Sequence, residues 1–375
     1  MGQSRDYEQQ IAVFGESGSG KTVLLSSFYG MHQDSSFMKS SNLRLVADDI
    51  GQGSALLKNY LDMRDSSVRP EPTRFKNFNY PFSIHLRDRR LGRSNNQEER
   101  LKITWHDYPG EWFEQEVSGP EEGQRRIETF RSLLGSQVGL LLVDAQRLAD
   151  NAGEEERYLK SLFGNFRNAL LNLKSGILTD GKRLTKFPRI WAIALSKADL
   201  LTDMDVTNFR DLLIKKSHDE ITALREVLGE FCESNEALSF GEDFVLLSSA
   251  RFEPSRIQVD ENLGLELLLP IAAALPLERQ NRWKERKIIA KNVLDELSPL
   301  FVKAFGFIVE KKVNKRGGKW IRVNLSEIAR EGFRKNIDED KRQINLTAEL
   351  LEKFFVTMQN AEDDEERPIL LRSLR

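Results

Sequence analysis

The sequence predicts an α/β fold with a mostly parallel sheet and helices on both faces. Short apolar runs of strand length alternate with longer segments of helical spacing through most of the 375-residue chain. Strands separated by such helices imply right-handed crossovers and therefore parallel strands. Two alternating segments, residues 82–86 and 101–105, are separated only by a charged, turn-like stretch. They predict a hairpin that contributes one antiparallel edge strand.

The remaining elements follow in order along the chain. The expected strands are residues 11–14, 138–143, 190–195 and 244–247. The expected helices begin at Lys21 and after Gly110, and then cover residues 154–173, 206–228 and 263–274. Residues 31–72 are polar, with a short helical pattern at 55–63, and they predict an inserted or mobile region.

The composition changes after the last of these helices. We therefore expect one unit over residues 1–280 and a smaller C-terminal α+β module over 281–360. Within the module, apolar runs at 307–309 and 320–323 flank a Lys-Arg-Gly-Gly turn, which predicts a basic β-hairpin between helices. The acidic residues 361–375 predict a disordered tail.

Composition excludes several classes of protein. A formal net charge of -2 argues against a nucleic-acid coat, and a single cysteine excludes an internal disulfide framework or a cysteine-rich zinc site. The longest apolar runs are far shorter than the roughly 20 residues that cross a bilayer. We expect a cytoplasmic protein without a transmembrane segment.

A glycine-rich loop joins the first strand to the first helix. It satisfies the pattern G-x-x-x-x-G-K-[ST] with the residues Gly15, Glu16, Ser17, Gly18, Ser19, Gly20, Lys21 and Thr22. In such a loop the backbone N–H groups surround a β-phosphate and the lysine reaches the β- and γ-phosphates. The Thr22 hydroxyl is the expected ligand of Mg²⁺.

A second motif follows the strand at 101–105. Asp107 is expected to hold the Mg²⁺, and Gly110 to offer its N–H to the γ-phosphate. A turn-forming Asp-x-Pro-Gly would explain these residues in isolation. Their position at the end of a strand beside the P-loop strand favours the metal site.

A third motif points to the base of the nucleotide. Ser196, Lys197 and Asp199 match the pattern [NT]-K-x-D with serine in the first place, where the aspartate can accept from both guanine donors. Ser248, Ser249 and Ala250 follow the next strand, where a loop near the guanine O6 is expected. Adenine, with Ser196 to Asp199 acting only as a strand-end cap, remains the rival interpretation.

Together these motifs resemble the G1, G3, G4 and G5 motifs of the translation-factor-like (TRAFAC) class of GTPases. Asp107 to Trp112, together with Gly20 to Val23, is similar to the YcjX-like bacterial GTPases. The resemblance covers about residues 8–280 and implies a Ras-like P-loop NTPase fold that binds GTP, GDP and Mg²⁺. It also implies catalytic roles for Lys21 and for a switch I threonine, which would complete the Mg²⁺ and γ-phosphate contacts; Thr73 is the candidate.

Glu111 stands where Ras-like proteins use a glutamine to orient the attacking water. An ionised carboxylate accepts hydrogen bonds but donates none, and a triphosphate repels it. Glu111 is therefore either a catalytic residue that orients water or a residue turned away from the phosphates. The second arrangement implies slow hydrolysis that waits for a partner.

The implied role is a regulatory switch that meets a protein effector or activator. A P-loop ATPase and a nucleotide-sensing scaffold with little hydrolysis are the alternatives. The basic hairpin of the C-terminal module could contact nucleic acid or an anionic membrane weakly, although a solvated charged face explains it more simply. A homo-oligomer is also compatible with the sequence.

Overall fold

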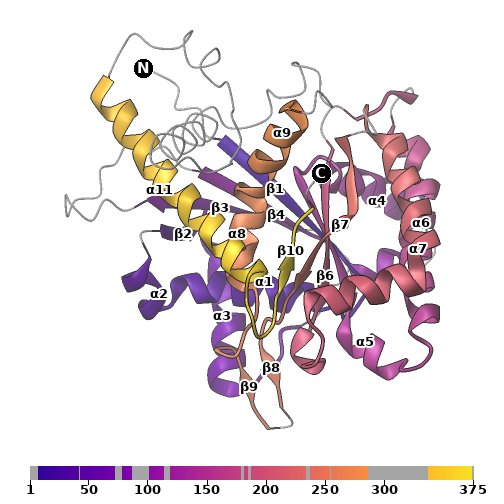
Figure 1. Cartoon of the computed structure of the whole chain (residues 1–375), viewed down its shortest axis with the longest axis horizontal. Helices are drawn as coiled ribbons and strands as arrows, with labels where there is room; N and C mark the ends of the chain where they lie inside the picture. The colour runs from indigo at the N-terminus through magenta and orange to yellow at the C-terminus, as the bar shows by residue number, and fades with distance from the viewer. Residues whose placement is uncertain are drawn as a thin grey trace.

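The computed structural model describes residues 7–41, 43–71, 78–86, 101–113, 119–178, 181–184, 187–233, 237–253, 255–285 and 337–373. Its centre is an eight-stranded sheet in the order β10-β7-β6-β5-β1-β4-β3-β2 (Figure 1). Within the described ranges, no helix combines the length and apolar character needed to cross a membrane.

Five strands at the centre of the sheet run parallel, as the sequence predicts. They are β1 (Tyr7–Phe14), β4 (Leu101–Asp107), β5 (Val138–Asp144), β6 (Ile190–Ser196) and β7 (Ser239–Leu246). β5 and β6 are buried along their whole length, which fits their nearly continuous apolar sequences. The carboxyl ends of all five strands therefore meet at one edge of the sheet.

Antiparallel pairing occurs at both sides of the sheet rather than at one edge strand. β3 (Phe78–Leu86) pairs with β4 as the predicted hairpin, but it is not the edge, because β2 (Leu43–Ala47) pairs with it on the outside. On the opposite side β10 (Leu370–Leu371) pairs antiparallel with β7. Sequence periodicity missed both additions because β2 lies in a polar region and β10 has only two residues.

The inserted region is folded throughout its described part. It contains α2 (Ser35–Ser40), β2 and α3 (Ile50–Ser66), and Asp49 caps α3 by accepting a hydrogen bond from the Gln52 N–H. α3 packs against α1 (Lys21–Gln33) and buries Leu56 and Met63. Buried apolar side chains on α3 therefore pack the described part of this region against the core, and its interpretation as an insertion remains a prediction.

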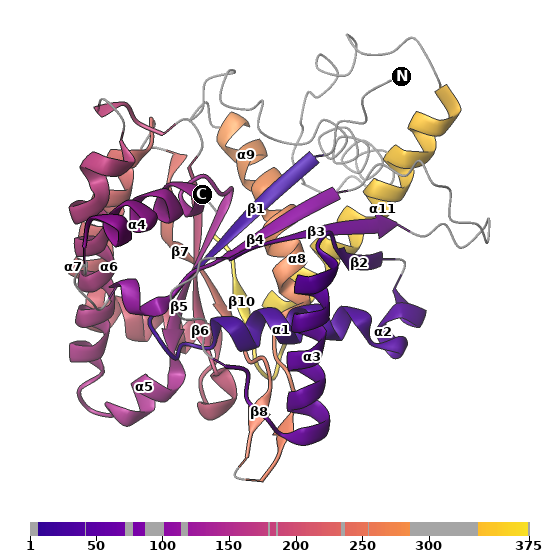
Figure 2. The ribbon, with the colours of Figure 1, turned by 180° about the vertical axis from the view of Figure 1, so that it is seen from behind.

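Helices cover both faces of the sheet (Figure 2). α4 (Pro120–Leu133), α6 (Glu155–Ile177) and α7 (Val206–Phe231) pack side by side on one face. α1, α8 (Leu268–Ala273) and α11 (Ile337–Glu362) cover the other. The smaller elements are α5 (Ala145–Asp150), α9 (Leu275–Glu285), the hairpin of β8 (Arg251–Phe252) and β9 (Ile257–Gln258), and three 3-10 turns, η1 (Gly110–Phe113), η3 (Ala198–Leu200) and η5 (Leu265–Leu267).

The C-terminal segment is part of the same core. Leu351 and Phe354 of α11 and Leu370 of β10 belong to the cluster of buried apolar residues that surrounds the sheet. The prediction of a disordered tail is therefore wrong for residues 361–373, because Ile369 and Leu370, which follow the acidic run in the sequence, are buried. The division at residue 280 remains a prediction, and the basic hairpin at 311–322 lies outside the described residues.

Candidate functional site

A cavity of about 580 Å³ opens at the carboxyl ends of the parallel strands, where ligands of open α/β sheets bind. Its volume lies in the usual range for small-molecule sites. All of the nucleotide motifs contribute to its lining. The lining residues from these motifs are Ser17, Gly18, Ser19, Gly20, Lys21, Thr22, Gly110, Glu111, Ser196, Lys197, Asp199, Ser249 and Ala250.

The P-loop has the backbone conformation that its glycines allow. Gly18 and Gly20 have φ angles of 79° and 91°, in the left-handed region that side chains disfavour. The buried ammonium of Lys21 donates to the carbonyls of Gly15, at 2.7 Å, and Glu16, at 3.1 Å. The lysine is thus held inside the loop, where phosphate oxygens could take the place of these carbonyls.

The strand-end motif of β4 packs directly on the P-loop. The Gly15 N–H donates to the buried Tyr108 hydroxyl at 2.7 Å, and this hydroxyl lies 3.1 Å from the Gly15 carbonyl. A Cβ at Gly110 would stand only 2.4 Å from the backbone nitrogen of Ser17. No side chain fits at position 110 without a shift of the backbone, so glycine is required for this close approach.

The residues expected to hold Mg²⁺ come from these two segments. Asp107 is buried at the end of β4, and one of its oxygens accepts a hydrogen bond from the Tyr108 N–H at 3.0 Å. Thr22 belongs to the first turn of α1 and lines the cavity, whereas Asp107 is buried and is not among the described lining residues. No cluster of three or more His, Cys, Asp or Glu suited to a metal occurs in the described part of the chain. The pair Thr22 and Asp107 fits Mg²⁺, which proteins usually hold with one or two side chains plus substrate phosphates.

Glu111 lines the cavity at the start of η1. The hydroxyl of Ser17 donates to one of its carboxylate oxygens at 3.4 Å. This carboxylate therefore faces the P-loop, on the side of the cavity where the phosphates are expected.

The base-reading motif is held in place by its neighbours. Lys197, with a left-handed φ of 55°, donates from its ammonium to Asp144 at 2.7 Å, and Ser196 donates to the Val143 carbonyl. The hydroxyl of Ser248, the first residue of the predicted loop Ser248 to Ala250, donates to Asp199 at 2.6 Å. The sequence identified this loop, but its role in orienting Asp199 becomes visible only in the structure.

The sequence also matches a known family. The model of the Double-GTPase 2 family matches residues 9–232, which is more than half of the chain. The chain belongs to the Double-GTPase 2 family. It is therefore a P-loop GTPase, and membership supports the binding of GTP and GDP and the hydrolysis of GTP. The matched region contains the P-loop and the motifs at Asp107 and Asp199.

Solved structures resemble this family member at low identity. A putative nucleolar GTP-binding protein 1 from Plasmodium falciparum is 14% identical, with 76% of this chain and 95% of that chain covered and a TM-score of 0.33. The signal recognition particle receptor complex SRb-GTP/SRX from Chaetomium thermophilum is 16% identical, with 66% of this chain and 93% of that chain covered and a TM-score of 0.33. The GTP-bound Ski7 GTPase-like domain of S. cerevisiae is 17% identical, with 65% of this chain and 43% of that chain covered and a TM-score of 0.30. All three TM-scores are below 0.5, and no curated protein matches the chain.

Two contributions to this Double-GTPase 2 site were missed by sequence reasoning. Arg147 of α5 donates to Glu16 at 2.6 Å and to the Ser17 carbonyl at 3.0 Å, and so braces the P-loop from outside. Arg69 lines the cavity with its guanidinium over the ring of Phe252, at 5.2 Å from the ring centre. Neither arginine belongs to a local motif, and no sequence signal marked them.

The remaining candidate, Thr73, lies outside the described residues. The chain is described up to Glu71, which lines the cavity together with Arg69 and Pro70. Residues 69–71 therefore line the cavity, and the switch I assignment of Thr73 stays a prediction.

Proposed function

We propose that this member of the Double-GTPase 2 family is a Mg²⁺-dependent regulatory switch with slow intrinsic GTP hydrolysis. Its GTP and GDP forms would present different surfaces to a protein effector or activator. The main support for this proposal is that the P-loop, Gly110 and the two base-reading loops all line the same cavity.

Each end of the cavity has a separate task in this proposal. At the phosphate end, Lys21 binds the β- and γ-phosphates and the Gly110 N–H responds to the γ-phosphate. Thr22 and Asp107 would hold Mg²⁺, which supplies charge neutralisation between the β- and γ-phosphates. Thr73 would complete this end. At the other end, Asp199 accepts from the guanine N1–H and 2-amino groups while the Lys197 stem covers the base.

The proposed slow hydrolysis depends on Glu111. Its carboxylate cannot donate a hydrogen bond, and it would face a triphosphate of the same sign of charge. Entry of GTP should therefore displace Glu111 from Ser17 and leave the attacking water poorly oriented. A partner that supplies a donor would then accelerate the reaction.

The finer expectations remain proposals beside this one. They are the YcjX-like resemblance, a cytoplasmic location, homo-oligomerisation, and weak contact of the basic hairpin with nucleic acid or anionic membrane. An ATPase and a scaffold with little hydrolysis are the rival functions, and Ser248 bonded to Asp199 favours the guanine-binding interpretation over the first of these.

Base choice is tested by equilibrium binding of labelled GDP and ADP to the wild type and to Asp199→Asn. We expect the wild type to prefer GDP, and the variant to lose GDP affinity about a hundredfold while gaining affinity for XDP, because an amide can donate to the xanthine O2. The exposed Asp203→Asn is the matched control and should change neither constant. Unchanged GDP binding in Asp199→Asn, or tight ADP binding in the wild type, would contradict the guanine site.

Hydrolysis is tested by a single-turnover assay with GTP, with and without Mg²⁺. We expect slow turnover that EDTA abolishes. If bound GTP persists unchanged with Mg²⁺ present, the chain is a nucleotide-sensing scaffold rather than a GTPase switch.

A further inference from the structure

The last described residues of the chain lie against the base-reading side of the site. Residues 363–373, called here the C-terminal strap, leave the end of α11 and run along the edge of the sheet as β10 (Figure 1). The Val206 N–H donates to the Pro368 carbonyl at 3.0 Å, and the Leu246 N–H to the Ile369 carbonyl at 2.8 Å. The strap thus joins the start of α7 to the end of β7.

One side chain of the strap reaches under the base-reading motif. The Arg367 guanidinium donates to the carbonyls of Ala198 and Leu201, each at 3.0 Å, and to that of Met204 at 3.1 Å. Ala198 begins the 3-10 turn η3 that contains Asp199, and Leu201 directly follows this turn. A planar guanidinium with several fixed donors suits three converging carbonyls, which a lysine ammonium on a flexible stem matches less well.

Asp199 is therefore fixed from two sides. Ser248 holds one carboxylate oxygen directly. Arg367 holds the backbone on either side of it. Burial lowers the pKa of Arg367, and the negative charge of Asp199 is the largest influence that opposes this shift. The Arg367 guanidinium thus interacts electrostatically with Asp199, while it donates hydrogen bonds to main-chain carbonyls.

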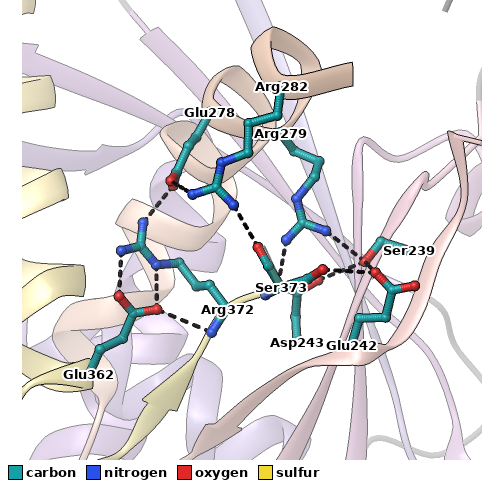
Figure 3. A network of polar contacts seen from close by, with 9 residues as sticks. All are labelled: Ser239, Glu242, Asp243, Glu278, Arg279, Arg282, Glu362, Arg372 and Ser373. Atoms are coloured by element: carbon teal, nitrogen blue, oxygen red, sulfur yellow. Dashed lines mark hydrogen bonds and ion pairs between the residues drawn. The ribbon is translucent and has the colours of Figure 1, made fainter. Parts of the chain in front are cut away.

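The strap is anchored at its far end by a network of charged residues (Figure 3). Arg372 donates to Glu362 of α11 and to Glu278 of α9, each at 2.5 Å. The Ser373 N–H donates to Asp243 of β7 at 2.9 Å. The position of Arg367 is consequently set by both ends of the strap rather than by a free tail.

We propose that Arg367 is a positioning residue for base recognition, and that the C-terminal strap is a structural part of the guanine site. The inference rests on the proposed function, in which Asp199 reads guanine. Arg367 keeps η3 at the distance and angle from which both carboxylate oxygens of Asp199 meet the base. The base affinity of the N-terminal GTPase region then depends on residues at the C-terminal end of the chain.

The test measures dissociation constants of GDP and IDP for the full-length wild type and for Arg367→Ala. IDP lacks the 2-amino group, so the ratio of the two constants reports how well Asp199 is aimed at the base. We expect the wild type to prefer GDP about ten- to hundredfold. In Arg367→Ala we expect GDP affinity to fall about tenfold while IDP affinity changes little, so that the preference for GDP over IDP falls by the same factor.

A matched control distinguishes a change in the orientation of Asp199 from a general loss of stability. Arg225 of α7 also donates to a backbone carbonyl, that of Leu238, but at the opposite end of the sheet. Arg225→Ala should leave the GDP-to-IDP ratio unchanged. If Arg367→Ala does not fold, Arg367→Lys, which retains the charge but not the fork, should show a smaller loss of the same ratio.

The outcomes distinguish this proposal from the proposed function. A wild type without preference for GDP over IDP would overturn the guanine assignment itself. A clear wild-type preference that survives intact in Arg367→Ala, or in Arg367→Lys where only that variant folds, would overturn the positioning role. An equal weakening of GDP and IDP would also overturn it, because it would show only general destabilisation.

Discussion

At the residue scale, the reactivity of the site depends on Glu111. Its carboxylate accepts a hydrogen bond from the Ser17 hydroxyl, and at 3.4 Å this bond is long. A weak neutral contact does little to hold an anion against the repulsion of a triphosphate. Glu111 lines the cavity, and we expect its carboxylate to turn away when GTP binds.

Glu111→Gln distinguishes this displacement from base catalysis. Glutamine has the same size and both donates and accepts, so we expect single-turnover GTP hydrolysis as fast as the wild type or up to about tenfold faster. Glu121→Gln, at the exposed start of α4, should have no effect. A loss of about a hundred- to ten-thousandfold in both Glu111→Gln and Glu111→Ala, with binding intact, would instead identify Glu111 as the catalytic base.

At the element scale, the P-loop is held between its own helix and two neighbours. The end of β4 supplies the Tyr108 hydroxyl to Gly15, and α5 supplies Arg147 to Glu16 and Ser17. Glu16 is only 4% exposed, so its charge needs this partner. The loop conformation is therefore maintained by contacts from the end of β4 and from α5.

Arg147→Ala should loosen this arrangement. We expect a loss of about 1–3 kcal/mol in the free energy of unfolding, because a buried carboxylate loses a charged donor, and a parallel loss of GDP affinity. Both can be measured by urea denaturation and equilibrium binding. Arg157→Ala, which breaks an exposed ion pair with Glu154 on α6, is the control and should change little. Unaltered nucleotide affinity in Arg147→Ala would show that α5 does not brace the loop.

At the scale of the whole molecule, distant parts of the chain meet in a buried charged network. Arg279 of α9 donates to Asp243 of β7 at 2.6 Å, and both side chains are 1% exposed. Arg279 also donates to the Ser239 hydroxyl, and Arg282 to the Ser373 carbonyl (Figure 3). The network therefore ties α9, β7 and the C-terminal strap into one unit.

Arg279→Ala should destabilise the whole chain. Removing one partner leaves the Asp243 carboxylate buried without its cation, which costs about 3–5 kcal/mol in the free energy of unfolding. Arg210→Ala, in an exposed pair with Asp211, should stay within about 1 kcal/mol of the wild type. Equal urea midpoints for the two variants would show that the network contributes little to stability.

The sequence alone was sufficient for the parallel sheet and for most of the nucleotide motifs. Each motif is a contiguous segment at the end of an apolar strand, and parallel strands bring such ends together at one edge. Local order of this kind is encoded by residues close in sequence. Ser17 to Thr22, Gly110 and the residues Ser196, Lys197 and Asp199 accordingly line one cavity, while their roles toward a nucleotide stay predictions.

Only the tertiary structure decided what surrounds those motifs. The contacts of Arg147 with Glu16, and of Arg367 with Ala198, join residues more than a hundred positions apart and carry no local pattern. The ordered strap was likewise hidden, because the acidic composition before it predicts disorder whereas two buried residues, Ile369 and Leu370, fix it to β7. These partners are selected by the shape and charge of surfaces that meet only in the folded chain, and a local sequence pattern does not contain that information.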